Sequence, residues 1–224
     1  MPAIQPSKMS RPPCVNRRER RSAEIRERLY RAALQIFAAR GYLATTVEDI
    51  TEAADVGKGT FFNYFPTKEH VLARYGEERI ATIERALEKA RAGDGPVLPI
   101  IKEHLETLAR QSSPSPDLFR SIIVAHCSCA PVRAEFQRRL QRGRRMMGGL
   151  FELAQERGEV RRDLSAGEMG RLMQVIFMGV TAAWSLNPDS DLVTTTEEVW
   201  KLISPTLKNG KFPSASVKKR RAKS

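Results

Sequence analysis

The sequence of 224 residues predicts an all-α protein, in which an N-terminal head of three helices is joined by a long helix to a C-terminal helical body. Three observations support this fold class. Apolar residues recur at spacings of three and four, the period of an amphipathic helix. No segment alternates apolar and polar residues as a half-buried strand does. Stops rich in Gly, Pro, Asn and Ser, such as residues 93–96 and 112–116, divide the chain into segments of helical length.

The first helix is predicted over residues 22–40. Ser22 is a suitable N-cap, and Gly41 suits the exit because glycine readily adopts the left-handed backbone conformation. One face carries the apolar residues Ile25, Leu29, Ala32, Ala33, Ile36 and Phe37. Such a face must pack against other helices, so this segment is expected to support the rest of the head.

Two short helices follow within residues 46–65. Thr45 and Thr46 precede Glu48 and Asp49, an arrangement typical of a capping box at a helix start. Residues 55–57 read Asp-Val-Gly, which allows only a sharp turn before a second helix over residues 58–64. We expect burial of Phe61 and Phe65, which lie four residues apart. Two short helices joined by a tight turn predict a helix-turn-helix.

The outward face of the second short helix is expected to contact double-stranded DNA. Lys58 is suited to donate to guanine, and Thr60 to contact a base edge or a thymine methyl group. Tyr64 and Lys68 are expected to hold phosphates, which fixes register without reading sequence. The predicted DNA-binding residues of this motif are Thr46, Lys58, Gly59, Thr60, Phe62, Asn63, Tyr64 and Lys68.

These residues carry a family signature. It runs Thr-Thr-Val-x-x-Ile-x-x-Ala-Ala over 45–54, Val-x-Lys-Gly-Thr-Phe over 56–61 and Asn-Tyr-Phe-Pro-x-Lys-Glu over 63–69. The segment resembles the TetR family of bacterial transcriptional regulators at motif level over residues 22–75. Beyond them only length, helical pattern and order of elements agree. Gly57 and Phe62 depart from the pattern, which commonly has Ser and Tyr there, and loss of a Ser cap costs ~0.5 kcal/mol or less.

The resemblance implies a function as well as a fold. It implies a ligand-responsive regulator of transcription, most often a repressor, which leaves a pseudo-palindromic operator when a small-molecule effector binds the body. It also implies a homodimer held by the last two long helices. The apolar residues of those helices that are candidates for the dimer interface are Leu172, Ile176, Val180, Trp184, Val199 and Ile203.

The effector-binding and dimerisation body is predicted over residues 69–207, with 22–68 as the DNA-binding domain. Its connecting helix runs from residue 67 to about 90, and further helices are expected near 97–110, 117–129, 131–157, 166–186 and 195–207. Pro205 should bend the last of these or end it early. Candidates to line an apolar pocket are His104, Phe119, His126, Met146, Met147 and Phe177, although ordinary core packing explains each one taken singly.

The formal net charge of +12 is concentrated at the two ends of the chain. Residues 1–21 hold six Lys and Arg against one Glu, residues 208–224 hold seven and no acid, and the rest is neutral. Both ends are predicted to be disordered basic segments. Arg17 and Arg18 are expected to enter a minor groove beside the recognition helix, the alternative being a solvated tail.

Several other functions are disfavoured by what the sequence lacks. No apolar run approaches the roughly 18 residues of a membrane span, and three cysteines make no disulfide framework, so we expect a cytoplasmic protein with no membrane partner. We expect no cofactor and no metal site, although His126, Cys127 and Cys129 leave a metal or redox role open. A solvated face is favoured over an anion site for Arg133, Arg138, Arg139, Arg142, Arg144 and Arg145.

Two functions are alternatives to a transcriptional regulator. An enzyme has little support, because no phosphate loop, nucleophile elbow or zinc-protease motif is present. An architectural protein that bends DNA through its basic ends, with no operator, is the second alternative.

Overall fold

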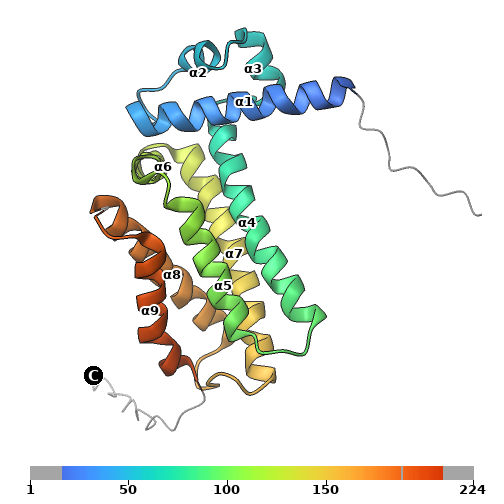
Figure 1. Cartoon of the computed structure of the whole chain (residues 1–224), viewed down its shortest axis with the longest axis vertical. Helices are drawn as coiled ribbons and strands as arrows, with labels where there is room; N and C mark the ends of the chain where they lie inside the picture. Colours follow the sequence, from blue (N-terminus) through green and yellow to red (C-terminus); the bar gives the residue numbers. More distant parts are fainter. Residues whose placement is uncertain (1–16, 188, 209–224) are drawn as a thin grey trace, which may run out of the picture.

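A computed structural model describes residues 17–187 and 189–208, and all regular structure among them is helical. Figure 1 shows a small head at one end of an elongated helical body. The head contains α1 (Arg17–Arg40), α2 (Val47–Ala53) and α3 (Lys58–Tyr64). The connector and the body are α4 (Glu69–Ala92), α5 (Leu98–Ser112), α6 (Pro116–Ser128), α7 (Ala130–Glu156), α8 (Ala166–Leu186) and α9 (Leu192–Leu207). The predicted all-α architecture is confirmed.

The apolar core between α1, α2 and α3 continues into α4 and α6. Phe61 and Phe65 are buried, as predicted, with ring centroids 5.7 Å apart, and Phe37 and Ile50 are buried with them. The Tyr42 hydroxyl donates to Glu69 at 2.8 Å and so links this core to the first turn of α4. Because aromatic side chains bury large areas, this cluster holds the two short helices in place although neither would be stable alone.

Local signals in the helix-turn-helix have the expected geometry. Thr46 caps α2 and shares a reciprocal capping box with Asp49. Asp55 lies in the left-handed region with φ 49°, and Gly41 with φ 83°, so both exits use the residues that the sequence provides for them. Gly57 is the N-cap of α3 and makes no side-chain cap hydrogen bond.

The start of α1 differs from the prediction. Residues 17–21 belong to the helix, so Ser22 is not its N-cap, and the basic arm predicted over residues 1–21 is wrong for those five residues. Arg and Glu are good helix formers, so the helix extends through residues 17–21. Residues 1–16 and 209–224, where the remaining predicted disorder falls, lie outside the described residues.

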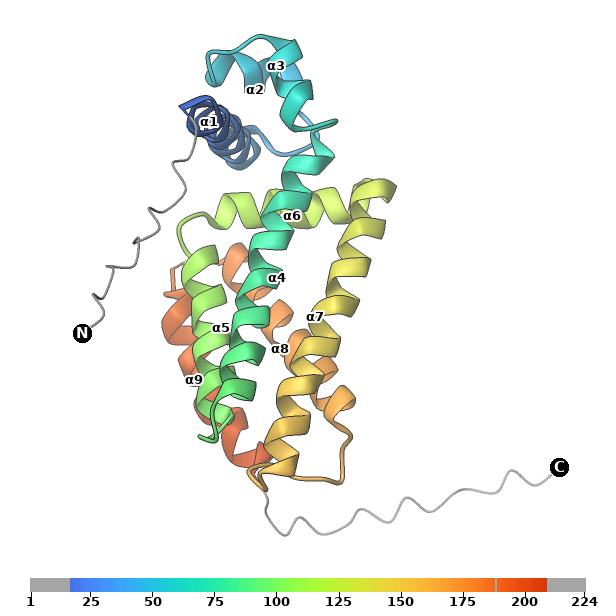
Figure 2. The same ribbon diagram turned by 90° about the vertical axis from the view of Figure 1, so that its right-hand side faces the viewer.

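The body packs α4, α5, α7, α8 and α9 lengthwise, while α6 crosses directly beneath the head (Figure 2). Buried residues such as Ile101, Leu150 and Phe151 form its main core. Helices α7 and α8 cross closely at two glycines. A Cβ added to Gly170 of α8 would lie 2.7 Å from the Gly148 nitrogen of α7, so glycine is what lets these two backbones approach.

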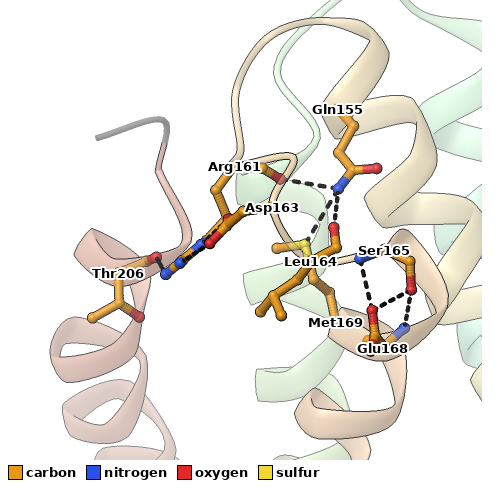
Figure 3. A network of polar contacts seen from close by, with 8 residues as sticks. All are labelled: Gln155, Arg161, Asp163, Leu164, Ser165, Glu168, Met169 and Thr206. Carbon is orange, nitrogen blue, oxygen red and sulfur yellow. Dashed lines mark hydrogen bonds and ion pairs between the residues drawn. The ribbon is translucent and has the colours of Figure 1, made fainter. Parts of the chain in front are cut away.

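The loop before α8 is fixed by polar contacts, shown in Figure 3. Gln155 of α7 donates its side-chain NH₂ to the carbonyls of Arg161 and Leu164 at 2.9 and 2.8 Å. Ser165 and Glu168 form a capping box at the start of α8. The Arg161 backbone N–H donates to the Leu207 carbonyl at 2.9 Å, which attaches the end of α9 to the same loop.

The last helix is longer than predicted. It begins at Leu192, three residues before the predicted start, because Asp191 caps it by accepting from the Thr194 backbone N–H. It continues through Pro205 to Leu207, the predicted end, so this proline does not end the helix early, and the alternative that it bends the last turn stays a prediction. No described helix has the length and apolar character needed to cross a membrane.

Candidate DNA-binding face and ligand cavity

The outward face of α3 is free of the head core. Lys58, Gly59 and Asn63 are exposed, and the Phe62 ring is 51% exposed although it is apolar. Phe61, on the opposite face, is fully buried. The packing of Phe61 and Phe65 therefore turns the predicted reading residues outward, as the sequence spacing indicated.

Two of these residues show how the face is held. The Lys58 ammonium forms an ion pair with Glu48 of α2, and both side chains are more than half exposed. Such surface pairs are worth about 0–1 kcal/mol, so Lys58 can exchange Glu48 for another acceptor at little cost. A Cβ added to Gly59 would meet nothing within 4 Å, so packing inside the protein does not require a glycine there.

Tyr64 and Lys68 have partners inside the head. The Tyr64 hydroxyl lies 3.1 Å from the Ser22 hydroxyl of α1. Lys68 donates to the carbonyls of Tyr42 and Thr45 at 3.1 and 2.9 Å and lies over the Tyr42 ring. Lys68 thus stabilises the loop before α2, a role that the sequence did not reveal, and its predicted phosphate contact stays a prediction.

Arg17 and Arg18 lie in the first turn of α1, not in an extended arm. Their predicted contact with the minor groove would therefore be made from a helix and stays a prediction. A shallow groove does separate α1 from α3, with Arg18, Ser22 and Arg26 on one side and Asn63 on the other. The four-residue spacing of 18, 22 and 26 was the signal for this side of the groove that sequence reasoning missed.

The body encloses a second candidate site, a cavity of about 420 Å³ between α4, α5, α6, α7 and α8. Its lining includes four of the six residues predicted for a ligand pocket, namely His104, Phe119, His126 and Phe177. Met147 also lines it, whereas Met146 does not and packs beside the main core. Most of the wall is apolar, and a volume of 300–1,000 Å³ is typical of small-molecule sites.

The two histidines of the cavity are neutral at pH 7. His104 is buried, and its ring nitrogen lies 3.2 Å from the Thr82 hydroxyl. Burial, together with the nearby Arg79, lowers its pKa to about 4. The His126 ring stacks on Phe136 at 3.7 Å, and burial and Arg139 lower its pKa to about 4 as well. Both rings therefore offer hydrogen bonds, not charge, at neutral pH.

The charged groups of the cavity wall are two arginines, Arg79 and Arg139, with no acidic residue among its described lining residues. Arg79 donates to the Tyr75 hydroxyl at 2.7 Å, to the Leu108 carbonyl at 3.3 Å and to Ser112. Arg139 is only 7% exposed. The expectation that Arg139 belongs to a solvated arginine face was wrong, because α4 covers it; Arg138, Arg142 and Arg145 are exposed as expected.

The cysteines do not form a metal site with their neighbours. Cys127 is exposed and Cys129 is partly buried. Within the described ranges, no three His, Cys, Asp or Glu side chains are grouped so as to hold a metal ion. Cys14 lies outside these ranges.

The predicted dimer residues divide between the core and the surface. Trp184 is 5% exposed and packs on Ala109 and Leu192, so its assignment to a dimer interface was wrong. Ile203 packs against the main core and is partly buried. Leu172 is exposed, while Ile176, Val180 and Val199 are half-buried. Further exposed apolar residues of α8 and α9 are Val175, Met178, Leu186 and Leu202.

Because the pKa of buried His104 is lowered, we predict that the protein loses stability in mild acid. Between pH 6.5 and about 4 the unfolded chain binds protons that His104 in the folded chain does not, so the free energy of unfolding should fall as pH falls through this window. The contribution of His104 alone to this decrease in the free energy of unfolding is roughly 3 kcal/mol. Melting temperatures between pH 7 and 4 should decline less steeply for His104→Gln than for the wild type. The exposed His70→Gln is the control, and parallel profiles for all three proteins would contradict the prediction.

Comparisons with known proteins agree with this geometry. Residues 29–75 match the family model described as bacterial regulatory proteins, tetR family. The HTH-type transcriptional regulator TcmR of Streptomyces glaucescens is 39% identical over 92 residues, 41% of each chain. The HTH-type transcriptional repressor DhaR of Mycobacterium sp. (strain GP1) is 40% identical over 70 residues, 30% of this chain and 35% of the relative. The matches thus span less than half the length of these curated relatives.

Solved structures extend the likeness to the body. FadR of Thermus thermophilus, a TetR-family transcriptional repressor in complex with lauroyl-CoA, matches with a TM-score of 0.61 and 28% identity over 84% of this chain and 98% of that one. FadR of Bacillus subtilis, in complex with stearoyl-CoA, matches with a TM-score of 0.67 and 21% identity over 80% and 97%. The second likeness shows the fold alone.

A helix-turn-helix head with an outward recognition face, mounted on a helical body, defines the class of helix-turn-helix transcription regulators. Within that class the signature of the head and the fold of the body agree on one family. The head, over residues 29–75, matches the tetR family of bacterial regulatory proteins, and over most of its length the chain has the fold of the TetR-family repressor FadR of Thermus thermophilus.

Proposed function

We propose that this chain is a ligand-responsive, sequence-specific DNA-binding regulator, which acts as a homodimer and represses transcription until a small molecule enters the cavity. The observation that carries the proposal is the position of α6 between the cavity and the head. Ile122 and Ala125 of α6 belong to the apolar core shared with α1, while Phe119 and His126 of the same helix line the cavity.

This position supplies a route for coupling. An occupant that displaces α6 also displaces α1, because buried side chains join the two and packed cores do not deform continuously. The head is further attached to α4 by Tyr30, whose hydroxyl donates to Glu78 at 2.9 Å, and by an ion pair between Arg74 and Glu27. A shift of α4 or α6 in each protomer would change the spacing of the two recognition helices.

Dimerisation is supported by the exposed apolar side chains of α8 and α9. Leu186 is 77% exposed and Leu202 is 76% exposed, and large apolar groups in contiguous patches mark interaction surfaces. One recognition helix reads only a few base pairs, whereas a two-fold dimer reads two half-sites about a helical turn or more apart. The proposed operator is therefore a pseudo-palindrome.

The relatives support repression and an apolar effector. DhaR is a transcriptional repressor, and the Thermus thermophilus FadR is a repressor in complex with lauroyl-CoA. The cavity of this chain is mostly apolar, as an acyl or aromatic effector would require. A regulator of this kind acts where the DNA is, so we place it in the cytoplasm.

The test is selection of bound sequences from a random DNA pool with the purified full chain. We expect enrichment of one pseudo-palindrome and a stoichiometry of one or two dimers per duplex. No enriched motif, or equal affinity for the selected and a scrambled duplex, would contradict the proposal and favour the architectural alternative.

A further inference from the structure

We propose that the effector is an amphipathic anion whose acidic group binds Arg139 and whose apolar part fills the rest of the cavity. The inference rests on the proposed function only for its effect on DNA; binding of the anion itself is a property of the body. It names the effector's chemical class and the residue that selects it.

The charged side chains in the described wall of the cavity are positive. Among its described lining residues are two arginines and no carboxylate. An apolar cavity strengthens the interaction of its charges with a bound group, and covering a cation that is paired only in part is costly. A neutral apolar occupant would cover the Arg139 donors that Glu135 does not engage, whereas a carboxylate would give them charge-assisted hydrogen bonds.

The N–H donors of the Arg139 guanidinium are only partly used by the described residues. Among the described residues, the hydrogen bond found for its guanidinium is the one from Nη1 to Glu135 Oε1, at 3.1 Å. A guanidinium has five N–H donors, and Arg139 is only 7% exposed. Burial lowers the pKa of Arg139, as expected for a cation that its protein neighbours compensate only in part. Its unused donors therefore suit an acceptor inside the cavity.

Arg79 is the weaker candidate for this role. Its Nη1 and Nη2 already donate to the Tyr75 hydroxyl, the Leu108 carbonyl and Ser112. These contacts join α4 to α5 and keep the guanidinium in the wall. Arg79 thus adds positive potential to the cavity, while Arg139 has the donors to spare.

Gly76 of α4 leaves space for the Arg139 side chain. A Cβ added to Gly76 of α4 would lie 2.2 Å from Arg139 Nε and 2.7 Å from both Cδ and Cζ. The guanidinium therefore lies against the backbone of α4, and a larger residue at position 76 would displace the end of this flexible side chain. A glycine in a helix interior lowers stability relative to alanine, and here the glycine allows a cation to be held at the cavity wall.

The size of the cavity limits the apolar part. The cavity volume of about 420 Å³ is the volume that roughly fourteen water molecules occupy in liquid water. A straight-chain acid such as dodecanoate has about that many non-hydrogen atoms. The cavity thus suits a medium-length acid or an aromatic acid of similar size.

The experiment compares dodecanoate, 1-dodecanol and dodecanoyl-CoA, each below its micellar concentration, by calorimetric titration of the full chain without DNA. We expect dodecanoate to bind the wild type about tenfold or more tightly than 1-dodecanol, as one charge-assisted contact allows. Equal affinities of the acid and the alcohol would overturn the proposal. So would binding of dodecanoyl-CoA alone with the same affinity in the wild type and in Arg139→Gln, because no acidic group of this anion would then depend on Arg139.

Two variants of adjacent residues test the role of Arg139. Arg139→Gln should abolish the preference for the acid, whereas Arg138→Gln should keep it, since Arg138 also pairs with Glu135 but is exposed and outside the cavity lining. Gly76→Ala should weaken the preference by displacing Arg139. An unchanged preference in Arg139→Gln would overturn the assignment. The wild-type comparison needs no variant, so it remains decisive if Arg139→Gln fails to fold.

The two proposals fail separately. Operator binding is measured in a second assay, with and without saturating dodecanoate. Binding of the acid through Arg139 without release of the operator would support the present inference and contradict the release step of the proposed function. Release by 1-dodecanol as effective as release by the acid would count against Arg139 and leave the proposed function intact.

Discussion

Gly170→Ala is expected to lower the free energy of unfolding by about 1–3 kcal/mol, the usual cost of overpacking a close contact. The added methyl group would lie 2.7 Å from the Gly148 nitrogen and 3.1 Å from the Arg144 carbonyl oxygen. Both are backbone atoms of α7, so no side-chain rotation relieves the clash, and the two helices must separate. Denaturant unfolding followed by circular dichroism, at one fixed protein concentration, measures the change.

Gly167→Ala is the matched control for this substitution. Gly167 lies in the same helix, three residues earlier, and a Cβ there would meet nothing within 4 Å. Alanine favours the helix over glycine, so this variant should be as stable as the wild type or slightly more stable. Equal unfolding midpoints for Gly170→Ala and Gly167→Ala would show that the crossing of α7 and α8 is looser than the structure indicates.

Replacing Lys58 with alanine and Thr60 with valine in one chain should reduce operator affinity by a hundredfold or more. A base contact is worth about 1–3 kcal/mol, and each contact occurs twice in a dimer on a palindrome. Lys58 is exposed and pairs only with the exposed Glu48 among described groups, so its removal should not unfold the head. Fluorescence anisotropy with the selected operator and a scrambled duplex, at one salt concentration, measures the discrimination.

Lys89→Ala is the control for loss of a positive charge. Lys89 lies in α4 within the body and forms a comparable exposed ion pair with Glu103. Its removal should leave the ratio of the two affinities unchanged. If the Lys58 and Thr60 substitutions weaken binding to both duplexes equally, α3 contacts only the phosphate backbone, and sequence-selective recognition by this helix is excluded.

The helix-turn-helix could be predicted residue by residue because its signals are local. A cap and its partner lie three residues apart, as Thr46 and Asp49 do, and both groups belong to one helix turn. The left-handed exit at Asp55 depends on the side chain at that position alone. The four-residue spacing of Phe61 and Phe65 indicates which face of α3 is buried, and the opposite face is therefore the exposed one.

The cavity was predictable only in part. His104, Phe119, His126 and Phe177 line it, yet the same residues pack equally well as a core in any arrangement of the helices. Whether a void remains between them depends on how α4 to α8 lie relative to one another, which no local pattern encodes. The residues were therefore correct as candidates, while their meeting at one cavity is a result of the tertiary structure.

The sequence by itself determined the order and ends of most helices, the recognition motif and its family, because these follow from backbone preferences and contacts within a few residues. Only the tertiary structure decided that Arg139 is buried, that Trp184 packs inside the protomer and that Lys68 stabilises the head. Burial depends on neighbours distant in sequence: Arg139 of α7 is buried because Gly76 of α4 leaves room for it. A helical sequence specifies which faces are apolar, but the packing of other helices decides which polar side chain is covered with them.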